Sequence, residues 1–373
     1  MSDCVASSIV LSQARSTVFR VLARQRIMKL LQSIRRRRFT LPTPPRASGK
    51  LNVLMVTSEK KNQLFYKDAE LARLTNAVRL FEHFPYEHYD WDMRRIVDAI
   101  YGDDHPDVIY IHYANEYHRL RHLNALNIPK LGFVGDPQDF VDDDAKHVVK
   151  RRWMSAAGIN AYFTIAPQAN WMVWQGLQTT AAELPIINCH LAVDSHLFYD
   201  MRLRRTRDIA VFGAFTDEYP FRNQVREYLR RQTTLRTNRR RRVRRGSSYH
   251  AEAFARELNR YKASFTCASI HGYTMAKYFE IPACGTLLFG ERTPLLSEFG
   301  YVDGGNFVEV SSENFVEKFE HYLLGVHPDD RLAIAASGQR LVHDRHTWAH
   351  RMPTVVNDIK AWLDSAHTLP RGC

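Results

Sequence analysis

A lysine and a glutamate three positions apart are the most informative chemical pair in this chain. Lys277 and Glu280 lie in residues 273–285, where the pattern predicts a short helix, a glycine turn and then a buried strand. Residues three apart share one face of a helix, so both side chains can point at one ligand. A cation suits a diphosphate, and a carboxylate suits ribose hydroxyls. The pair therefore predicts a site for a nucleotide sugar.

Five further segments flank this pair in a recognisable order. They are residues 258–263, 263–267, 304–310, 313–318 and 346–351. Together the six segments resemble the donor-binding half of GT-B glycosyltransferases, and in particular the spore-maturation-type (group 1, family 4-like) proteins. The resemblance implies an α/β fold with two Rossmann-like domains facing a cleft. It also implies a metal-independent glycosyltransferase that moves a sugar from a nucleotide-diphosphate sugar to a hydroxyl acceptor, either a glycan or a lipid-linked compound, with no cofactor.

The resemblance assigns the donor site to residues of the second half. Glu280 matches the residue that holds the ribose, and Lys277 and Arg222 match the cations that contact the diphosphate. Gly213 follows a predicted strand, where a missing side chain lets a nucleotide approach the backbone. Tyr273 precedes the predicted helix and is expected to face the cleft. Except for Tyr273, each of these residues also has a structural alternative, such as a helix cap, a surface charge or a tight turn.

The acceptor side is less defined. Asp136 follows a predicted strand of the first half, where a carboxylate could orient or deprotonate an acceptor hydroxyl, or could cap a helix. His112 ends another strand and is expected to shape the acceptor pocket. The wider retaining pattern has a glutamate eight residues before Glu280, whereas this chain has Gly272. The stereochemical outcome is therefore left open.

Short apolar runs alternate with helical patterns in both halves of the chain, which predicts two parallel sheets. The expected strands are residues 51–56, 107–112, 130–134, 161–165 and 184–188, then 208–212, 263–267, 285–289 and 307–310, with a helix from about 66 to 84. Neither half contains G-x-G-x-x-G, which disfavours a dinucleotide-dependent dehydrogenase.

A chain of 373 residues fits two domains. We predict a basic amphipathic leader and proline linker over residues 1–49 and an N-terminal Rossmann-like acceptor domain over 50–200. A C-terminal Rossmann-like donor domain follows over 201–345. Residues 346–373 are predicted to form a helix that crosses back to the first domain.

The net charge of +12 is concentrated in the leader. The first 50 residues hold eleven Lys and Arg against the single acid Asp3. Apolar residues recur with helical spacing over residues 9–38, a pattern typical of a helix on an anionic membrane surface. A solvated tail and a mitochondrial transit peptide are alternatives. A second basic run, residues 236–245, predicts a polyanionic partner or a solvated loop.

No apolar run in the sequence is long enough to span a bilayer. Cys189, Cys267 and Cys284 stand in apolar contexts, which predicts buried free thiols, and no C-x-x-C pair or metal-ligand cluster is present. We therefore expect a cytoplasmic protein without a metal, either free in the cytoplasm or peripheral on a membrane. Two other functions stay open: glycosylation of modified bases in DNA, which makes nucleic acid a less favoured partner, and a degenerate transferase that acts as a scaffold or a nucleic-acid-binding protein.

Overall fold

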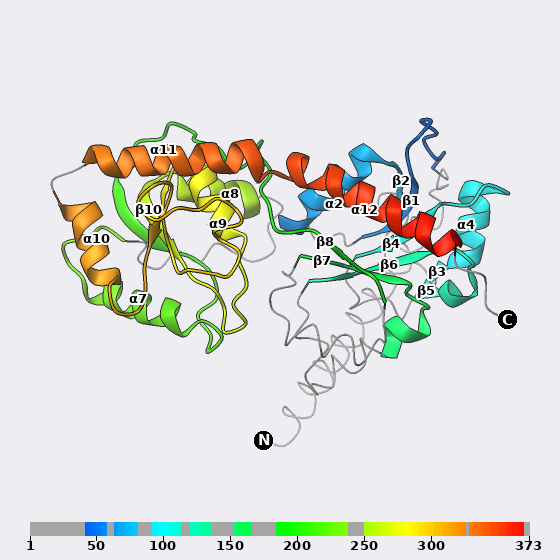
Figure 1. Ribbon diagram of the computed structural model, residues 1–373, viewed down its shortest axis with the longest axis horizontal. Helices are drawn as coiled ribbons and strands as arrows, with labels where there is room; N and C mark the ends of the chain where they lie inside the picture. The colour runs from blue at the N-terminus through cyan, green and yellow to red at the C-terminus, as the bar shows by residue number, and fades with distance from the viewer. Residues whose placement is uncertain are drawn as a thin grey trace, which may run out of the picture. The chain divides into compact units, whose positions relative to one another are not determined.

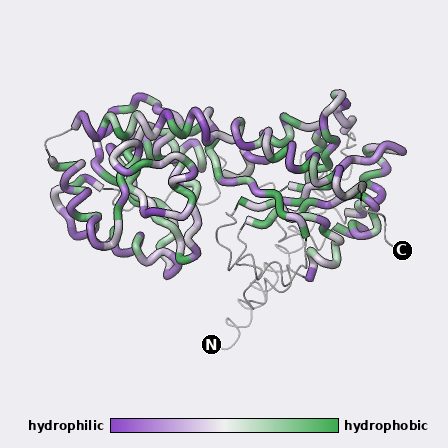
Figure 2. Tube along the Cα trace, in the orientation of Figure 1, coloured by the Kyte–Doolittle hydropathy of each residue, from purple (hydrophilic) through white to green (hydrophobic). Residues whose placement is uncertain are grey.

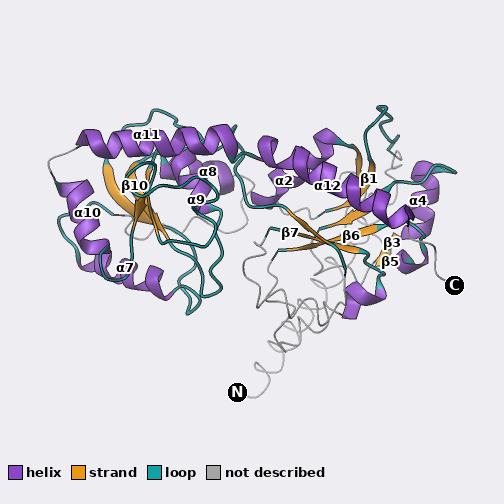
Figure 3. Cartoon of the chain, viewed as in Figure 1, coloured by secondary structure: helices purple, strands orange, loops and turns teal. Residues whose placement is uncertain are grey.

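The computed structural model describes residues 42–57, 63–80, 91–112, 120–135, 152–165, 184–237, 250–325 and 328–368. From Thr43 onward the chain forms one compact unit. Helices flank the strands of two parallel sheets within it (Figures 1 and 3). The predicted α/β class with two parallel sheets is therefore confirmed. The membrane-helix prediction for residues 9–38 and the basic run after Thr237 lie outside the described residues, as does Asp136.

The first sheet has six parallel strands in the order β2-β1-β4-β6-β7-β8. Its strands are β1 (Asn52–Val56), β2 (Asn76–Arg79), β4 (Val108–Ile111), β6 (Lys130–Val134), β7 (Ala161–Thr164) and β8 (Ile186–Asn188). Figure 2 shows hydrophobic residues along these strands, as expected for a parallel sheet covered on both faces. Helix α4 (Met93–Tyr101) packs in one hydrophobic core, and α2 (Gln63–Leu74) and α12 (Trp348–Thr368) pack in the other.

The second sheet has four parallel strands in the order β12-β11-β10-β9. They are β9 (Arg207–Val211), β10 (Tyr261–Thr266), β11 (Leu287–Gly290) and β12 (Val308–Glu309). One face packs on α7 (Pro220–Arg231), α10 (Phe315–Leu324) and the first half of α11 (Pro328–Arg345), and the other packs on α8 (His250–Leu258) and α9 (Lys277–Ala283). A small separate sheet pairs β3 (Trp91–Asp92) with β5 (Leu120–Arg121).

The predicted helix over residues 66–84 is wrong over residues 75–79, and its last four residues lie outside the described part of the chain. Helix α2 ends at Leu74, and residues 76–79 form β2 beside β1. Thr75 Oγ1 donates to Leu71 O at 2.8 Å, and Asn76 N donates to Leu51 O at 2.7 Å. The backbone therefore leaves the helix and takes its hydrogen bonds from the neighbouring strand, a partner that helical periodicity does not reveal.

The three cysteines predicted to be buried free thiols, Cys189, Cys267 and Cys284, are buried and free. None of the helices in the described parts of the chain combines the length and the apolar character needed to cross a membrane. The predicted limits of the four chain segments stay predictions.

Helix α12 supplies much of the core behind the first sheet. Thr347, just before this helix, pairs with Val193 in a parallel bridge, and the buried side chains of α12 then pack among those of β1 and β4. Ile359 is 1% exposed in this core. The far end of the chain is therefore part of the core of the first sheet.

We predict that Ile359→Ala lowers the free energy of unfolding by about 2 to 5 kcal/mol, because it leaves a cavity in a packed core. Urea unfolding followed by circular dichroism measures the change. Asp358→Ala, at an exposed position one residue earlier, is the control and should change it by less than about 0.5 kcal/mol. Equal effects of the two substitutions would contradict the packing of α12 on the first sheet.

Candidate functional site

The carboxyl ends of the strands in the second sheet bring together four of the five predicted donor residues. Gly213 lies two residues past the end of β9, Arg222 lies in α7, and Lys277 and Glu280 lie in α9. A Cβ atom placed on Gly213 would lie 2.9 Å from Arg222 Nη1 and 3.6 Å from Lys277 Cε. Open α/β sheets bind ligands at this edge, so the arrangement is that of a ligand site.

Arg222 is a fixed, buried cation. Its Nη1 donates to Ala214 O at 3.0 Å, and its Nη2 donates to Cys267 O at 3.4 Å. The guanidinium also lies over the ring of Tyr219, 3.8 Å from its centroid. Within the part of the chain that the structure describes, Arg222 Nε has no hydrogen-bond partner. The contacts hold the guanidinium in place and leave the buried Nε–H without a protein partner among the described residues.

Glu280 is a buried carboxylate, and the charge of Lys277 compensates the cost of its burial only weakly. Burial raises its pKa to about 7, and the positive charge of Lys277 opposes that rise. Burial also lowers the pKa of the half-buried Lys277. Glu280 Oε2 finds no hydrogen-bond partner among the described residues. A hydrogen-bond donor on a ligand would therefore favour the ionised form of this carboxylate.

The raised pKa of Glu280 predicts that the protein loses stability as the pH rises. Between an ordinary pKa of 4.5 and about 7, the unfolded chain has an ionised Glu280 while the folded protein keeps it protonated. The resulting loss in the free energy of unfolding approaches about 3 kcal/mol above pH 7. We therefore expect Glu280→Gln to raise the free energy of unfolding at pH 8 and to change it little at pH 4.5. Urea unfolding at the two pH values measures both.

The exposed Glu298 gives the matched control. Glu298→Gln should leave the difference in the free energy of unfolding between pH 4.5 and pH 8 as it is in the wild type. If Glu280→Gln leaves it unchanged as well, Glu280 does not have the raised pKa on which this prediction depends.

Gly213 is a position where a side chain would disturb the site directly. Its φ of +121° is one that other residues rarely adopt, and an added Cβ would crowd Arg222 Nη1. We predict that Gly213→Ala costs about 1 to 3 kcal/mol in the free energy of unfolding and displaces the guanidinium. Gly304→Ala is the control, because Gly304 also has a positive φ but has no atom within 4 Å of an added Cβ.

Unfolding measurements on the two alanine variants, with a crystal structure of Gly213→Ala, test this prediction. A loss of stability no larger than that of Gly304→Ala, with Arg222 unmoved, would contradict close contact at Gly213.

Tyr273, the fifth predicted donor residue, lies apart from the other four. Its side chain is buried in the hydrophobic core that also contains Val56, Ile111 and Val134 of the first sheet. Its ring stacks on His271 with the centroids 5.7 Å apart. The described contacts place it in a core, so its assignment as a donor-binding residue stays a prediction.

His112 belongs to a buried polar cluster that sequence analysis did not detect. Lys67 Nζ donates to Asp68 Oδ1 at 2.7 Å and also to the hydroxyl of Tyr110, which in turn donates to Asp68 Oδ1 at 3.0 Å. His112 Nδ1 hydrogen-bonds to Asp68 Oδ2. The Lys67 ammonium also lies 4.2 Å from the centroid of the Phe133 ring. We call Lys67, Asp68, Tyr110 and His112 the first-sheet cluster.

The charges of the first-sheet cluster are well compensated. Burial alone would raise the pKa of Asp68, but Lys67 and His112 outweigh it and lower this pKa to about 2. Burial lowers the pKa of His112 despite the neighbouring Asp68. A signal was present in the sequence: Lys67 and the buried Leu71 are four apart and share the inner face of α2. A lysine on the apolar face of a helix needs a buried partner.

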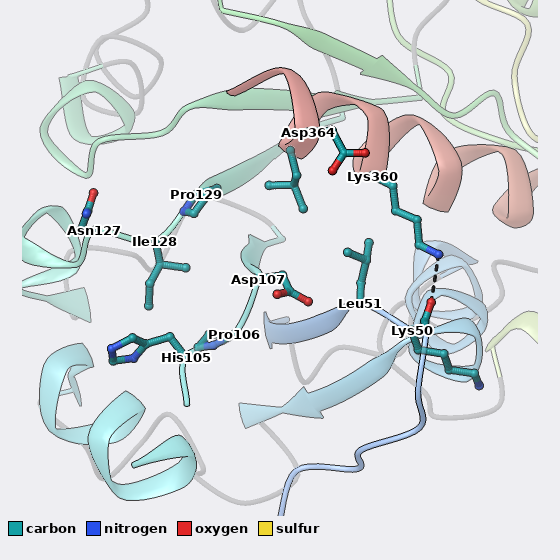
Figure 4. A pocket seen from close by; sticks show the side chains of 12 residues that line it. Lys50, Leu51, His105, Pro106, Asp107, Asn127, Ile128, Pro129, Lys360 and Asp364 are labelled. Atoms are coloured by element: carbon teal, nitrogen blue, oxygen red, sulfur yellow. Dashed lines mark hydrogen bonds between the residues drawn. The ribbon is translucent and has the colours of Figure 1, made fainter. Parts of the chain in front are cut away.

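A cavity of about 490 Å³ lies at the opposite end of the first sheet. It is found where β1, β4 and β6 begin, beside the last turns of α12, and its polar lining includes Lys50, His105, Asp107, Lys360 and Asp364 (Figure 4). None of the predicted site residues lines it. We therefore locate the candidate site by the convergence of Arg222, Lys277 and Glu280 and not by this cavity.

Residues 195–357 match the family model described as glycosyl transferase-like. This range contains four predicted donor residues: Gly213, Arg222, Lys277 and Glu280. This part of the chain is similar to glycosyl transferase-like domains. No curated protein sequence matches the chain. The match supports the predicted glycosyltransferase family, while the narrower spore-maturation-type resemblance stays a prediction.

Solved structures extend the likeness over both sheets of this chain. Sucrose-phosphate synthase from Thermosynechococcus elongatus superposes with a TM-score of 0.53 at 11% identity, over 86% of this chain and 100% of that one. HepE of Anabaena, in complex with UDP and glucose, superposes with a TM-score of 0.55 at 11% identity, over 84% of this chain and 100% of that one. At such identities the comparison establishes the fold, and the fold is GT-B.

Proposed function

We propose that the protein is a glycosyltransferase that moves a sugar from a nucleotide-diphosphate sugar to a hydroxyl acceptor. The observation that carries the proposal is the convergence of Arg222, Lys277 and Glu280 beside Gly213, at the carboxyl edge of a sheet. Two cations and a carboxylate next to an uncovered backbone are the groups that a diphosphate joined to a ribose requires.

The two cations act on the leaving group. When the bond between the sugar and the diphosphate breaks, its electron pair leaves with the nucleoside diphosphate. Arg222 is held by Ala214 O and Cys267 O, so its charge is in place before the reaction begins. Lys277 also approaches Gly213, with its Cε 3.6 Å from where a Cβ would lie, and adds a second positive charge. We infer that these charges replace a metal ion at the diphosphate.

Glu280 binds the ribose in this proposal. An ionised carboxylate accepts hydrogen bonds from both ribose hydroxyls, and Oε2 has no competing partner among the described residues. The hydroxyl acceptor, a glycan or a lipid-linked compound, would enter from the first sheet, where His112 follows β4. The solved structures of HepE contain UDP, glucose and UDP-glucose, which makes UDP-glucose the first donor to test.

We predict that a matching nucleotide sugar, with UDP-glucose tested first, stabilises the wild-type protein by about 2 to 3 kcal/mol at a hundred times its Kd. Lys277→Ala and Glu280→Gln should each remove most of this stabilisation. Lys318→Ala, in α10 of the same domain, should keep it. A thermal-shift series over nucleotide sugars, with EDTA present throughout, followed by calorimetry on the best ligand, measures binding and its independence of metal.

The pH dependence of binding gives a sharper test. Glu280 ionises at about pH 7, so the Kd of wild type should fall about tenfold between pH 6 and pH 8, and that of Glu280→Gln should not. The diphosphate of a nucleotide sugar carries no terminal phosphate, so the ligand itself does not titrate in this range. No binding of any nucleotide sugar by the wild type would overturn the proposed function.

A further inference from the structure

Arg351 is a half-buried cation in the first turn of α12, and none of the described residues places a carboxylate beside it. Burial lowers its pKa, and the thiol of Cys189 and the phenol of Tyr301 act against that change. Burial raises the pKa of both of these groups, so neither carries a negative charge near neutral pH. A charge removed from water is costly unless it is paired. The described part of the chain therefore leaves the positive charge of Arg351 uncompensated.

The contacts of Arg351 hold one end of its guanidinium. His346 Nε2 hydrogen-bonds to Phe299 O at 2.7 Å, and a carbonyl oxygen only accepts, so this nitrogen carries the proton. Burial and the charge of Arg351 lower the pKa of His346 to about 4, so the ring is neutral and its Nδ1 accepts from Arg351 Nη2 at 2.8 Å. The Arg351 Cζ also lies 5.0 Å from the centroid of the Phe299 ring. Arg351 Nη1 has no hydrogen-bond partner among the described residues and is not fully buried, so a ligand can reach it.

His190 presents a second open group beside the same aromatic ring. It lies two residues past the end of β8, and the centroids of its ring and the Phe299 ring are 5.2 Å apart. Burial and the charge of Arg351 lower the pKa of His190 to about 4, so at neutral pH the imidazole is neutral and has one N–H to donate. Within the described ranges neither ring nitrogen has a hydrogen-bond partner, and neither is fully buried. Arg351 and His190 therefore offer N–H donors that no described residue accepts.

The position of this pair links the first sheet to the donor helix. His190 follows β8 at the carboxyl edge of the first sheet, where open α/β sheets bind ligands. Arg351 Cζ lies 6.0 Å from the centroid of the Phe279 ring in α9, and Glu280 of the donor site is the next residue. The pair is therefore close to the donor helix and at the sheet from which the acceptor is proposed to enter.

Resting on the proposed function, we propose that Arg351 and His190 bind an anionic group of the acceptor, a phosphate or a carboxylate. A guanidinium pairs with either group through charge-assisted hydrogen bonds, and the imidazole N–H adds one more donor. The anion supplies the negative charge that the described residues around Arg351 lack. A neutral sugar cannot supply it, and this difference makes the pair a determinant of acceptor specificity.

The test follows the ring of His190 by NMR in the full-length wild type labelled with 13C-histidine, with no nucleotide present. The His190 signal is assigned by its loss in His190→Gln. The probes are glucose 6-phosphate and glucuronate, with glucose as the neutral control. We expect at least one anion to shift the signal saturably and to raise the pKa of His190 by about one unit or more, because a nearby negative charge favours the imidazolium. Glucose should do neither, and the anion that acts distinguishes a phosphate from a carboxylate acceptor.

Substitutions of Arg351 separate this site from other basic parts of the chain. Arg351→Met removes the cation, leaves no opposite charge unpaired, and should abolish both effects. Arg351→Lys keeps the charge without the planar fork and should bind the anion about tenfold more weakly. Arg340→Met, at an exposed position of α11, is the control and should leave both effects unchanged. The basic leader and the donor site also attract anions, so the His190 signal is what assigns binding to this pair.

The inference fails if neither anion moves the His190 signal, or if the signal moves as much in Arg351→Met as in the wild type. It also fails if a nucleotide sugar that stabilises the wild type competes with the anion, because the donor would then occupy the pair. A wild type that binds the anion but no nucleotide sugar is a different outcome. That result refutes the proposed function, and with it the acceptor role, while the anion site itself stands.

Discussion

Burial of charge at the carboxyl ends of parallel strands is the constraint on which the candidate site depends. Arg222 is 2% exposed, and two backbone carbonyl groups and the ring of Tyr219 stabilise it there. Because Gly213 has no side chain, the guanidinium and Lys277 approach the same stretch of backbone. A larger residue at this position would separate the cations from the strand end, and with them the proposed diphosphate site.

The two sheets solve the problem of buried charge in different ways. In the first-sheet cluster, Lys67 and His112 compensate Asp68 so well that its pKa falls to about 2. In α9 the pKa of Glu280 rises to about 7, because burial outweighs the charge of Lys277. A compensated carboxylate can orient a neighbour without a ligand. A carboxylate whose charge is poorly compensated gains most when a ligand supplies hydrogen-bond donors, which fits the binding role proposed for Glu280.

Most strands were predictable because buried parallel strands are short apolar runs, and these stand out in the sequence. The error over residues 75–79 has a definite cause. Asn76 and Val78 are buried and lie in β2, but whether such a short segment continues a helix or joins a sheet depends on whether a strand edge is available. That edge belongs to β1, more than twenty residues earlier in the chain.

Residue types and local spacing were sufficient to place Lys277 and Glu280 on one short helix, because a helix repeats over three to four residues. They were also sufficient for the α/β class and for the order of the family motifs. The approach of Arg222 to Gly213, the burial of Tyr273 and the first-sheet cluster depended on the folded chain. Asp68 and His112 are 44 positions apart, and only the packing of α2 against β4 brings their side chains into contact, since no local repeat relates a helix to a strand so distant in sequence.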